Sequence, residues 1–139
     1  MIVLDTGGLY AALDANERLH GRVVAALVSA SPPRILSPFV LAELDYLIAS
    51  RVGHESQVAL LDEVTRGAYQ LEPFSSGDVA EARRIIERYA DLRIGLADAS
   101  VVVLAQRHRT LDLLCADERH FRVLRGPGGK PFRLMPFDA

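Results

Sequence analysis

The sequence predicts an α/β fold, a three-layer α/β/α sandwich around a mainly parallel central sheet. Short apolar runs alternate along the chain with longer segments in which apolar residues recur at helical spacing. Such alternation of strands and helices is typical of a parallel sheet covered on both faces. With 139 residues, half of them hydrophobic, the chain is long enough for one domain with a substantial core.

The first third of the chain predicts two strands and three helices. Residues 1–4 form a short buried strand, and a polar turn at residues 5–8 leads into a short helix over residues 9–13. Asn16 is a plausible N-cap for a second helix that ends before the Pro32-Pro33 pair. Residues 34–37 form the second strand. Ser as cap and Pro at the first helical position then open a helix at Ser37-Pro38 that runs to about Ser50.

The remaining elements continue this alternation. We expect helices over residues 54–66, from residue 76 to about residue 89, and over the strongly apolar residues 96–108. We expect strands over residues 68–72, 111–116 and 132–135, and a short helical turn over residues 118–124. The glycine-rich residues 126–129 lack the preceding strand and following helix of a phosphate-binding glycine loop, so they are predicted to be a turn.

Composition places few limits on function. No apolar run approaches the ~20 residues of a transmembrane helix, and no signal peptide is evident, so we expect a cytoplasmic protein without membrane contact. Cys115 is the one cysteine and is expected to be buried and reduced. The net charge of −2 neither indicates nor excludes a nucleic-acid partner. The basic residues are arginines except Lys130, and arginine is suited to forked contacts with phosphate.

Four acidic residues lie in or at the ends of apolar segments. Asp5 closes the first apolar run, Glu43 interrupts a helical one, Asp98 begins another, and Asp117 follows the run 113–116. A buried unpaired carboxylate costs several kcal/mol, and no basic residue lies beside these four in sequence, so they need a partner. A shared divalent cation is the simplest one, and carboxylates suit Mg²⁺ or Mn²⁺.

The predicted elements bring these acids toward one place. Asp5 and Asp117 each follow a strand, so both project from the carboxyl edge of the sheet, where parallel α/β folds bind ligands. If the two strands are neighbours, these carboxylates can share an ion. Glu43 borders the inward stripe of its helix, and Asp98 lies in a first helical turn, where the macrodipole favours an anion.

Each acid also has an ordinary structural explanation. Asp98 is explained as a helix cap, Asp5 as a turn residue, and Glu43 as a rim carboxylate paired with an arginine. Asp117 is explained as a loop residue or cap. These explanations are less plausible for all four acids together than for any one. Thr6 either orients the carboxylate of Asp5, binds a metal-held water, or caps the turn.

Other site types fit less well. The four histidines include no pair at zinc-ligand spacing, and no nucleophile motif built on Ser, Cys or Thr is present. A receiver-like phosphoacceptor domain needs an acidic neighbour for the first Asp and a lysine after a late strand, and both are missing. A haloacid-dehalogenase-type phosphatase needs Asp where Gly7 stands.

Four short motifs resemble those of a known family. They are Ile-Val-Leu-Asp-Thr at 2–6, Ser-Pro-Phe-Val-Leu-Ala-Glu-Leu at 37–44, Gly-Leu-Ala-Asp-Ala-Ser at 95–100, and Ala-Asp-Glu-Arg-His-Phe at 116–121. In order and spacing, across essentially the whole chain, they resemble the PIN-domain ribonucleases, and specifically the VapC-type toxins of type II toxin–antitoxin systems. Ala116 departs from the family's usual hydroxyl-bearing residue or Leu.

The resemblance implies a single PIN-like nuclease domain over residues 1–139. It implies a Mg²⁺- or Mn²⁺-dependent endoribonuclease, in which one or two ions activate the attacking water and stabilise the phosphate. The acids that would hold the ions and catalyse cleavage are Asp5, Glu43, Asp98 and Asp117. The substrate would be a tRNA or ribosomal RNA, recognised by shape and unstacked bases. The arginines near the acidic motifs, Arg93, Arg119 and Arg122, are candidate RNA contacts or solvated surface residues.

The resemblance also implies partners. It suggests a homodimer and a cognate VapB-type antitoxin, for which the apolar segments 39–49 and 54–66 offer surfaces, although core packing explains these residues equally well. The alternative function is a catalytically silent PIN-like binding module. The intact acidic set argues against that alternative.

Overall fold

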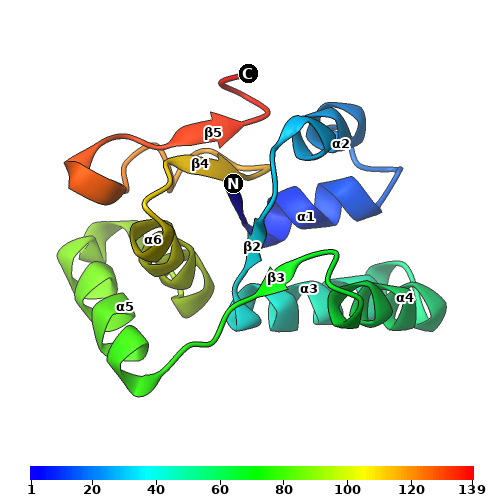
Figure 1. Cartoon of the computed structure of the whole chain (residues 1–139), viewed down its shortest axis with the longest axis horizontal. Helices are drawn as coiled ribbons and strands as arrows, with labels where there is room; N and C mark the ends of the chain where they lie inside the picture. Colours follow the sequence, from blue (N-terminus) through cyan, green and yellow to red (C-terminus); the bar gives the residue numbers. More distant parts are fainter.

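The computed structural model describes residues 1–139 and is built on one five-stranded sheet. All strand pairs are parallel, and the strand order is β3-β2-β1-β4-β5. The strands are β1 (Ile2–Leu4), β2 (Arg34–Leu36), β3 (Gln70–Leu71), β4 (Asp112–Leu114) and β5 (Arg133–Met135). Figure 1 shows the strands between the helices, so the predicted α/β sandwich with a parallel sheet is confirmed.

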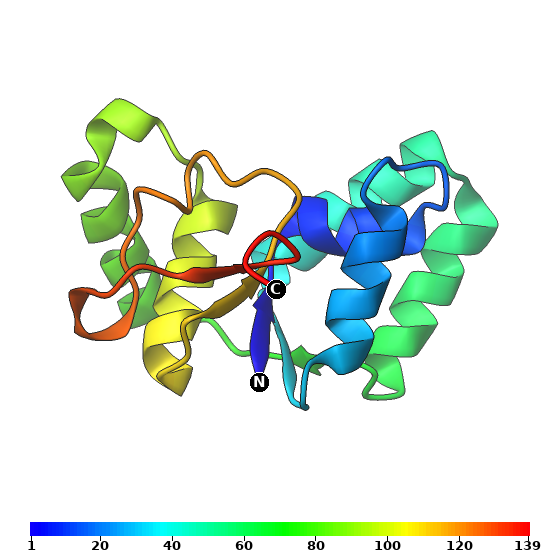
Figure 2. The same ribbon diagram turned by 90° about the horizontal axis from the view of Figure 1, so that it is seen from above.

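Six helices fall into two groups on either side of β1 and β2. Figure 2 shows α5 and α6 in one group and α1 to α4 in the other. The helices are α1 (Thr6–Leu13), α2 (His20–Ser29), α3 (Pro38–Arg51), α4 (His54–Thr65), α5 (Ser76–Arg88) and α6 (Leu96–His108). None of them has the length and apolar character needed to span a membrane.

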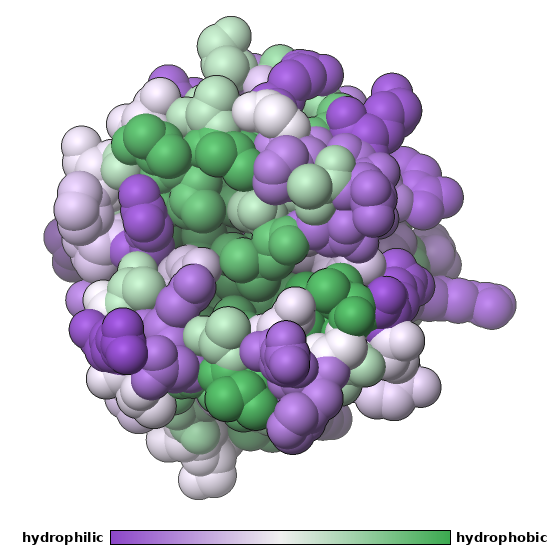
Figure 3. Space-filling view, turned by 90° about the vertical axis from the view of Figure 1, so that its right-hand side faces the viewer, coloured by the Kyte–Doolittle hydropathy of each residue, from purple (hydrophilic) through white to green (hydrophobic).

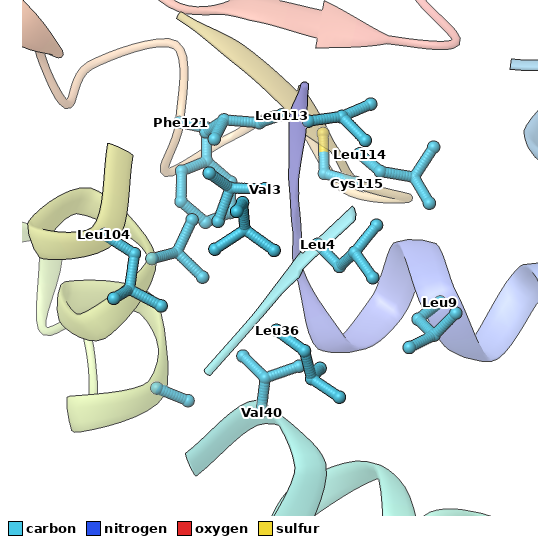
Figure 4. Packing of buried hydrophobic residues seen from close by; sticks show 14 of the residues in the cluster. Val3, Leu4, Leu9, Leu36, Val40, Leu104, Leu113, Leu114, Cys115 and Phe121 are labelled. Carbon is cyan, nitrogen blue, oxygen red and sulfur yellow. The ribbon is translucent and has the colours of Figure 1, made fainter. Parts of the chain in front are cut away.

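The central strand β1 is buried on both faces, as expected for a parallel strand covered by helices. Val3 is in register with Ile35 of β2 and Leu113 of β4. Figure 4 shows Val3 on the side of Leu104, whereas Leu4 points toward Leu9 of α1. Alternate side chains of the strand therefore anchor the two helix groups, and this fixes where residue 5 emerges.

The predicted polar turn at residues 5–8 is wrong. Helix α1 begins at Thr6, directly after β1, and Asp5 occupies its N-cap position. Gly8 lies inside this helix, and a Cβ there would sit 2.5 Å from the carbonyl oxygen of Leu114. The glycine is needed because α1 passes very close to the backbone of β4, not because the chain turns there.

The predicted N-cap at Asn16 is also wrong. Helix α2 begins at His20, and Asn16 lies in the preceding turn, where its backbone N–H donates to Asp14 Oδ1 at 2.9 Å. The predicted start of α3 is confirmed, because Ser37 Oγ accepts a hydrogen bond from the N–H of Phe39 at 3.1 Å. An Asn is favourable in a turn as well as at a cap, so its identity could not decide between them.

The C-terminal half has the predicted order of strands and helices, but each of its strands is shorter than predicted. Residues 118–124 form turns and no regular helix, although the N–H of Leu124 donates to the carbonyl of His120 at 3.0 Å. The segment 126–129 is a turn, as expected, with a short 3-10 element at Pro127–Gly129. Cys115 is free and buried, also as expected.

Candidate active site

Asp5 emerges from the carboxyl edge of the sheet between β1 and α1. Its backbone N–H donates to the carbonyl of Leu114 at 2.9 Å, which continues the pairing of β1 with β4 by one residue. The residue is only 9% exposed, and no cationic side chain pairs with it. The fold therefore holds this carboxylate rigidly, largely out of water and without a compensating charge.

The electrostatic surroundings of Asp5 disfavour its charged form. Burial, followed by the charge of Asp98, raises the pKa of Asp5 to about 7. Glu43 acts in the same direction, while the backbone amides of Thr6 and Gly7 at the start of α1 oppose it. Three of the four predicted acids thus interact at one place, and their mutual repulsion calls for a cation.

Glu43 reaches this place from α3. Thr6 Oγ1 donates a hydrogen bond to Glu43 Oε1 at 2.7 Å. The expectation that Glu43 borders the inward stripe needs correction, because the buried residues of α3 are Val40, Leu44 and Ile48, and Glu43 itself is exposed. Glu43 is a rim carboxylate, as one of the explanations above predicted. Its partner, however, is the hydroxyl of Thr6 and not an arginine. The hydroxyl of Thr6 therefore orients Glu43, not Asp5.

Asp98 lies in the first turn of α6 and is partly buried. Its Oδ2 contacts His120 Nδ1 at 3.0 Å. Sequence reasoning missed His120, because it looked only for histidine pairs at zinc-ligand spacing. The available signal was that His120 lies within the fourth motif, three residues after Asp117, on the loop that returns over α6.

Asp117 stands apart from the other three acids. Strands β1 and β4 are neighbours, so Asp5 and Asp117 do leave the same edge of the sheet. The side chain of Asp117 is 54% exposed, however, and its two oxygens accept from Arg119 Nε at 3.0 and 2.9 Å. Hydrogen bonds from the side chain and backbone of Arg119 lower the pKa of Asp117 to about 2. Asp117 is already neutralised by a neighbour two residues away.

Only one of the four acids is buried, although the sequence predicted that all four would be shielded from water. Asp5 is buried, Asp98 is partly buried, and Glu43 and Asp117 are exposed. No group of three or more Asp, Glu, His or Cys side chains is arranged so that it could hold a metal ion. The donor chemistry nevertheless fits a hard divalent cation, because Asp5 lacks a cation and feels two further carboxylates. Side-chain rotation and water ligands would have to complete the coordination.

A buried serine pair connects the helices that carry Glu43 and Asp98. Ser37 Oγ and Ser100 Oγ lie 2.6 Å apart, and Ser100 Oγ also donates to the carbonyl of Ala97 at 2.6 Å. Because Ser37 caps α3 and Ser100 lies in α6, the pair fixes the start of one helix against the other. The motifs contained both serines, but nothing in the sequence indicated that they would meet.

The three arginines predicted near RNA differ in their freedom. Arg93 is exposed and forms no ion pair, and its backbone is left-handed, with φ 52°. Arg119 is bound to Asp117. Arg122 donates to Glu118 and to both oxygens of Asp138. Only Arg93 is therefore available without breaking an existing contact.

Comparison with known proteins relates almost the whole chain to one family. The PIN domain family model matches residues 2–126. Ribonuclease VapC26 of Mycobacterium tuberculosis is 43% identical over 135 residues, which cover 97% of this chain and 100% of that protein. Among solved structures, M. tuberculosis VapC20, a sarcin–ricin loop cleaving toxin, has a TM-score of 0.80 at 21% identity and covers 86% of this chain and 92% of its own.

A second solved structure, FitAcB from Neisseria gonorrhoeae, has a TM-score of 0.58 at 26% identity, covering 78% of this chain and 83% of its own. The structural likenesses agree with the α/β fold, and the similarity in sequence to Ribonuclease VapC26 extends over almost the whole chain. On the strength of the family match and of 43% identity over almost the whole chain, the chain belongs to the PIN-domain family.

Proposed function

We propose that this protein is a metal-dependent endoribonuclease that acts as the toxin of a VapBC-type toxin–antitoxin pair. The observation that carries the proposal is the buried carboxylate of Asp5, whose pKa is raised to about 7 by burial and by the acids beside it. Carboxylates whose pKa is strongly raised by burial together with a like-charged neighbour cluster at functional sites. The chain's similarity to Ribonuclease VapC26 supports RNA as the substrate class.

Asp5, Glu43 and Asp98 are the proposed ligands of Mg²⁺, with Mn²⁺ as a substitute. A bound divalent cation would supply an acidified water and neutralise charge on the phosphate. Asp117 is proposed as the fourth catalytic acid, and it has to exchange Arg119 for the ion or its waters. Thr6 holds Glu43 in place, and His120 holds Asp98. Phosphate contacts by Arg93, Arg119 and Arg122 remain proposals.

The substrate is proposed to be a structured tRNA or ribosomal RNA. The solved VapC20 structure belongs to a toxin described as cleaving the sarcin–ricin loop, and its fold is close to this one. Proteins recognise structured RNA mainly through its shape and its unstacked bases. A cytoplasmic location follows from such a substrate, and residues 1–139 are proposed to form one nuclease domain.

The proposed partners are a VapB-type antitoxin and a second copy of the chain. Figure 3 shows apolar side chains gathered on the face that α1 to α4 form. Exposed apolar residues on α3 and α4 are Tyr46, Val58 and Leu61. A hollow lined by Ala42, Glu43, Tyr46 and Leu47 lies beside the acidic site, so a segment docked there would reach it.

A catalytically silent PIN module is the second candidate. The observation that favours it is the pairing of Asp117 with Arg119, together with the lack of a preformed three-ligand group. A silent module would bind metal or RNA without cleaving it. The two candidates therefore differ in turnover and not in binding.

The deciding experiment is cleavage of total cellular RNA by the purified, antitoxin-free protein, with mapping of the new ends. Mg²⁺ or Mn²⁺ should produce discrete cuts that chelator abolishes and added metal restores. Asp5→Ala serves as the control for a contaminating nuclease. Metal binding measured by calorimetry without any cut would move the conclusion to the silent module.

A further inference from the structure

A second polar site lies at the far end of α6 from Asp98. It is a cavity of about 610 Å³ between α5, α6 and the segment 125–129, and we call it the arginine cavity. Its polar side chains are Arg88, Arg109, Arg125, Gln106 and Tyr89. Its volume lies within the range of about 300–1,000 Å³ usual for small-ligand sites.

The arginine cavity contains cationic groups without carboxylate partners. None of its lining residues is acidic, although the chain as a whole carries a net charge of −2. Neither Arg88 nor Arg109 donates a side-chain hydrogen bond, and Arg125 donates only to the carbonyls of Arg122 and Leu124. Elsewhere arginines such as Arg107 and Arg133 are bound to acids. Three guanidinium groups without carboxylate partners in one hollow attract an anion.

Helix ends explain part of this pattern and not all of it. Arg88 is the last residue of α5, and Arg109 is the C-cap of α6, where the macrodipole favours a cation. This explanation does not extend to Arg125, which is in a loop. Gly126 packs against Phe132 and Leu111, where a Cβ would lie 2.7 Å from the ring of Phe132 and 2.8 Å from the side chain of Leu111, which follows α6. Arg125 lies beside this packed glycine and lines the same cavity as Arg88 and Arg109.

The arginine cavity is connected to the acidic site through α6 and the loop above it. Asp98, Val102 and Gln106 recur at helical spacing, so they share one face of α6, and Arg109 follows as the C-cap at the end of the helix. Asp98 and Arg109 are separated by roughly 16 Å along the axis, at about 1.5 Å per residue. The loop over this face contacts Asp98 through His120 at one end and supplies Arg125 to the cavity at the other.

We propose that the arginine cavity binds a phosphate group of a ribonucleotide chain at a distance from the bond that is cut. The inference rests on the proposed function, because RNA is taken as the substrate. Forked guanidinium groups hold the phosphate, and the half-buried Tyr89 offers a ring for an adjacent base. A free nucleotide carries the same chemistry, so the test includes both sources.

The test compares Arg88→Gln/Arg109→Gln with the control Arg18→Gln/Arg22→Gln in the full-length protein. The pairs are matched: each removes two charges from exposed arginines without ion pairs, and each loses one cation–π contact, of Arg88 with Tyr89 or of Arg22 with Phe137. The probes are a fluorescein-labelled 24-nucleotide single-stranded RNA and AMP. Binding is measured in chelator, which stops metal-dependent cleavage, at several salt concentrations.

We expect the cavity variant to bind the RNA about 10-fold more weakly and to reduce the steepness of log affinity against log salt by roughly 0.7, the value for one phosphate contact on a single strand. The control variant should stay within about 2-fold of the wild type. A loss confined to AMP identifies a free nucleotide as the occupant. Equal binding by both variants, for both probes, overturns the site.

Parallel cleavage assays in Mg²⁺ separate this inference from the proposed function. If the wild type binds the probe through the cavity but never cuts RNA, the cavity site is supported and the proposed nuclease function is rejected. If the wild type cuts RNA and the cavity variant binds and cuts it equally well, the nuclease function is supported and the cavity site is rejected. Melting temperatures of both variants verify that neither substitution has unfolded the chain.

Discussion

Asp5 and Glu72 occupy the same kind of position and are treated by the fold in opposite ways. Asp5 follows β1 and Glu72 follows β3, and each residue is 9% exposed at an end of a parallel strand. Burial by itself acts to raise the pKa of both carboxylates. For Asp5 the charges of Asp98 and Glu43 add to this effect, and the pKa rises to about 7.

Glu72 is instead surrounded by donors. It contacts His108 Nε2, accepts from Gln70 Nε2 at 3.2 Å and lies 3.5 Å from Arg107 Nη1. Burial alone would raise its pKa, but the hydrogen bonds from His108 and Gln70 and the charges of His108 and Arg107 together leave it lowered. Burial therefore does not distinguish a structural carboxylate from a functional one. The sign of the surrounding charge does.

The largest effect should come from removing the charge that acts most strongly on Asp5. Asp98→Asn keeps the shape of the side chain and its place in the first turn of α6, so the protein should remain folded. We expect RNA cleavage in Mg²⁺ to fall by roughly 10³-fold, because the ion that would neutralise charge on the phosphate loses one of its proposed ligands. Asp91→Asn, which changes an exposed acid outside the site, should cleave at the wild-type rate. Wild-type activity in Asp98→Asn would remove Asp98 from the mechanism.

Asp5→Asn should stabilise the metal-free protein. Because the folded-state pKa of Asp5 is above its ordinary 3.8, the folded protein holds a proton that the unfolded chain releases, and stability falls as pH rises from about 4 to about 7. At pH 8 the variant should gain up to about 4 kcal/mol in the free energy of unfolding, at about 1.36 kcal/mol per pKa unit.

Urea unfolding in chelator at pH 4 and pH 8 measures this gain. The difference between Asp5→Asn and the wild type should appear at pH 8 and nearly vanish at pH 4. A variant that is less stable than the wild type at pH 8 would show that Asp5 has a structural role, and the contrast with Glu72 would be lost.

Glu72→Gln should change stability with the opposite sign. Its lowered pKa means that the charged form stabilises the fold above the ordinary glutamate range, and that this contribution is lost as pH falls through the folded-state value. At pH 7 we expect a loss of about 1–3 kcal/mol, because His108 and Arg107 lose their partner. The same urea titration measures it, and the loss should shrink below pH 4. Unchanged stability at pH 7 would mean that the cluster around Glu72 contributes nothing.

The sequence predicted the sheet and the approach of the acids because both follow from local pattern. Apolar runs placed β1 and β4, and the acids that follow them therefore had to leave one edge. What failed depended on contacts between distant segments. The close passage of α1 over Leu114, which requires Gly8, looked like a turn in the sequence. No spacing rule could reveal that His120 meets Asp98 or that Ser37 meets Ser100.

The smallest predicted effect concerns how the acidic group is held. Thr6→Val keeps the shape of the side chain and removes the hydroxyl that donates to Glu43 at 2.7 Å. We expect the cleavage rate to fall about 10-fold and the Mg²⁺ concentration for half-maximal activity to rise, as when a group that orients a metal ligand is lost. Thr6→Ser restores the hydroxyl and should recover most of the activity.

The control for this change is Thr65→Val, because Thr65 also donates one hydrogen bond, to the carbonyl of Asp62 at 2.8 Å, but lies at the end of α4. Both valine variants should lose less than about 1.5 kcal/mol of stability, the usual value of one hydrogen bond. If the two variants lose activity equally, the hydroxyl of Thr6 acts only through folding. If only Thr6→Val shifts the Mg²⁺ dependence, the exposed Glu43 is a ligand that needs to be positioned. Asp5, by contrast, is held in position by the sheet and needs no such hydroxyl to position it.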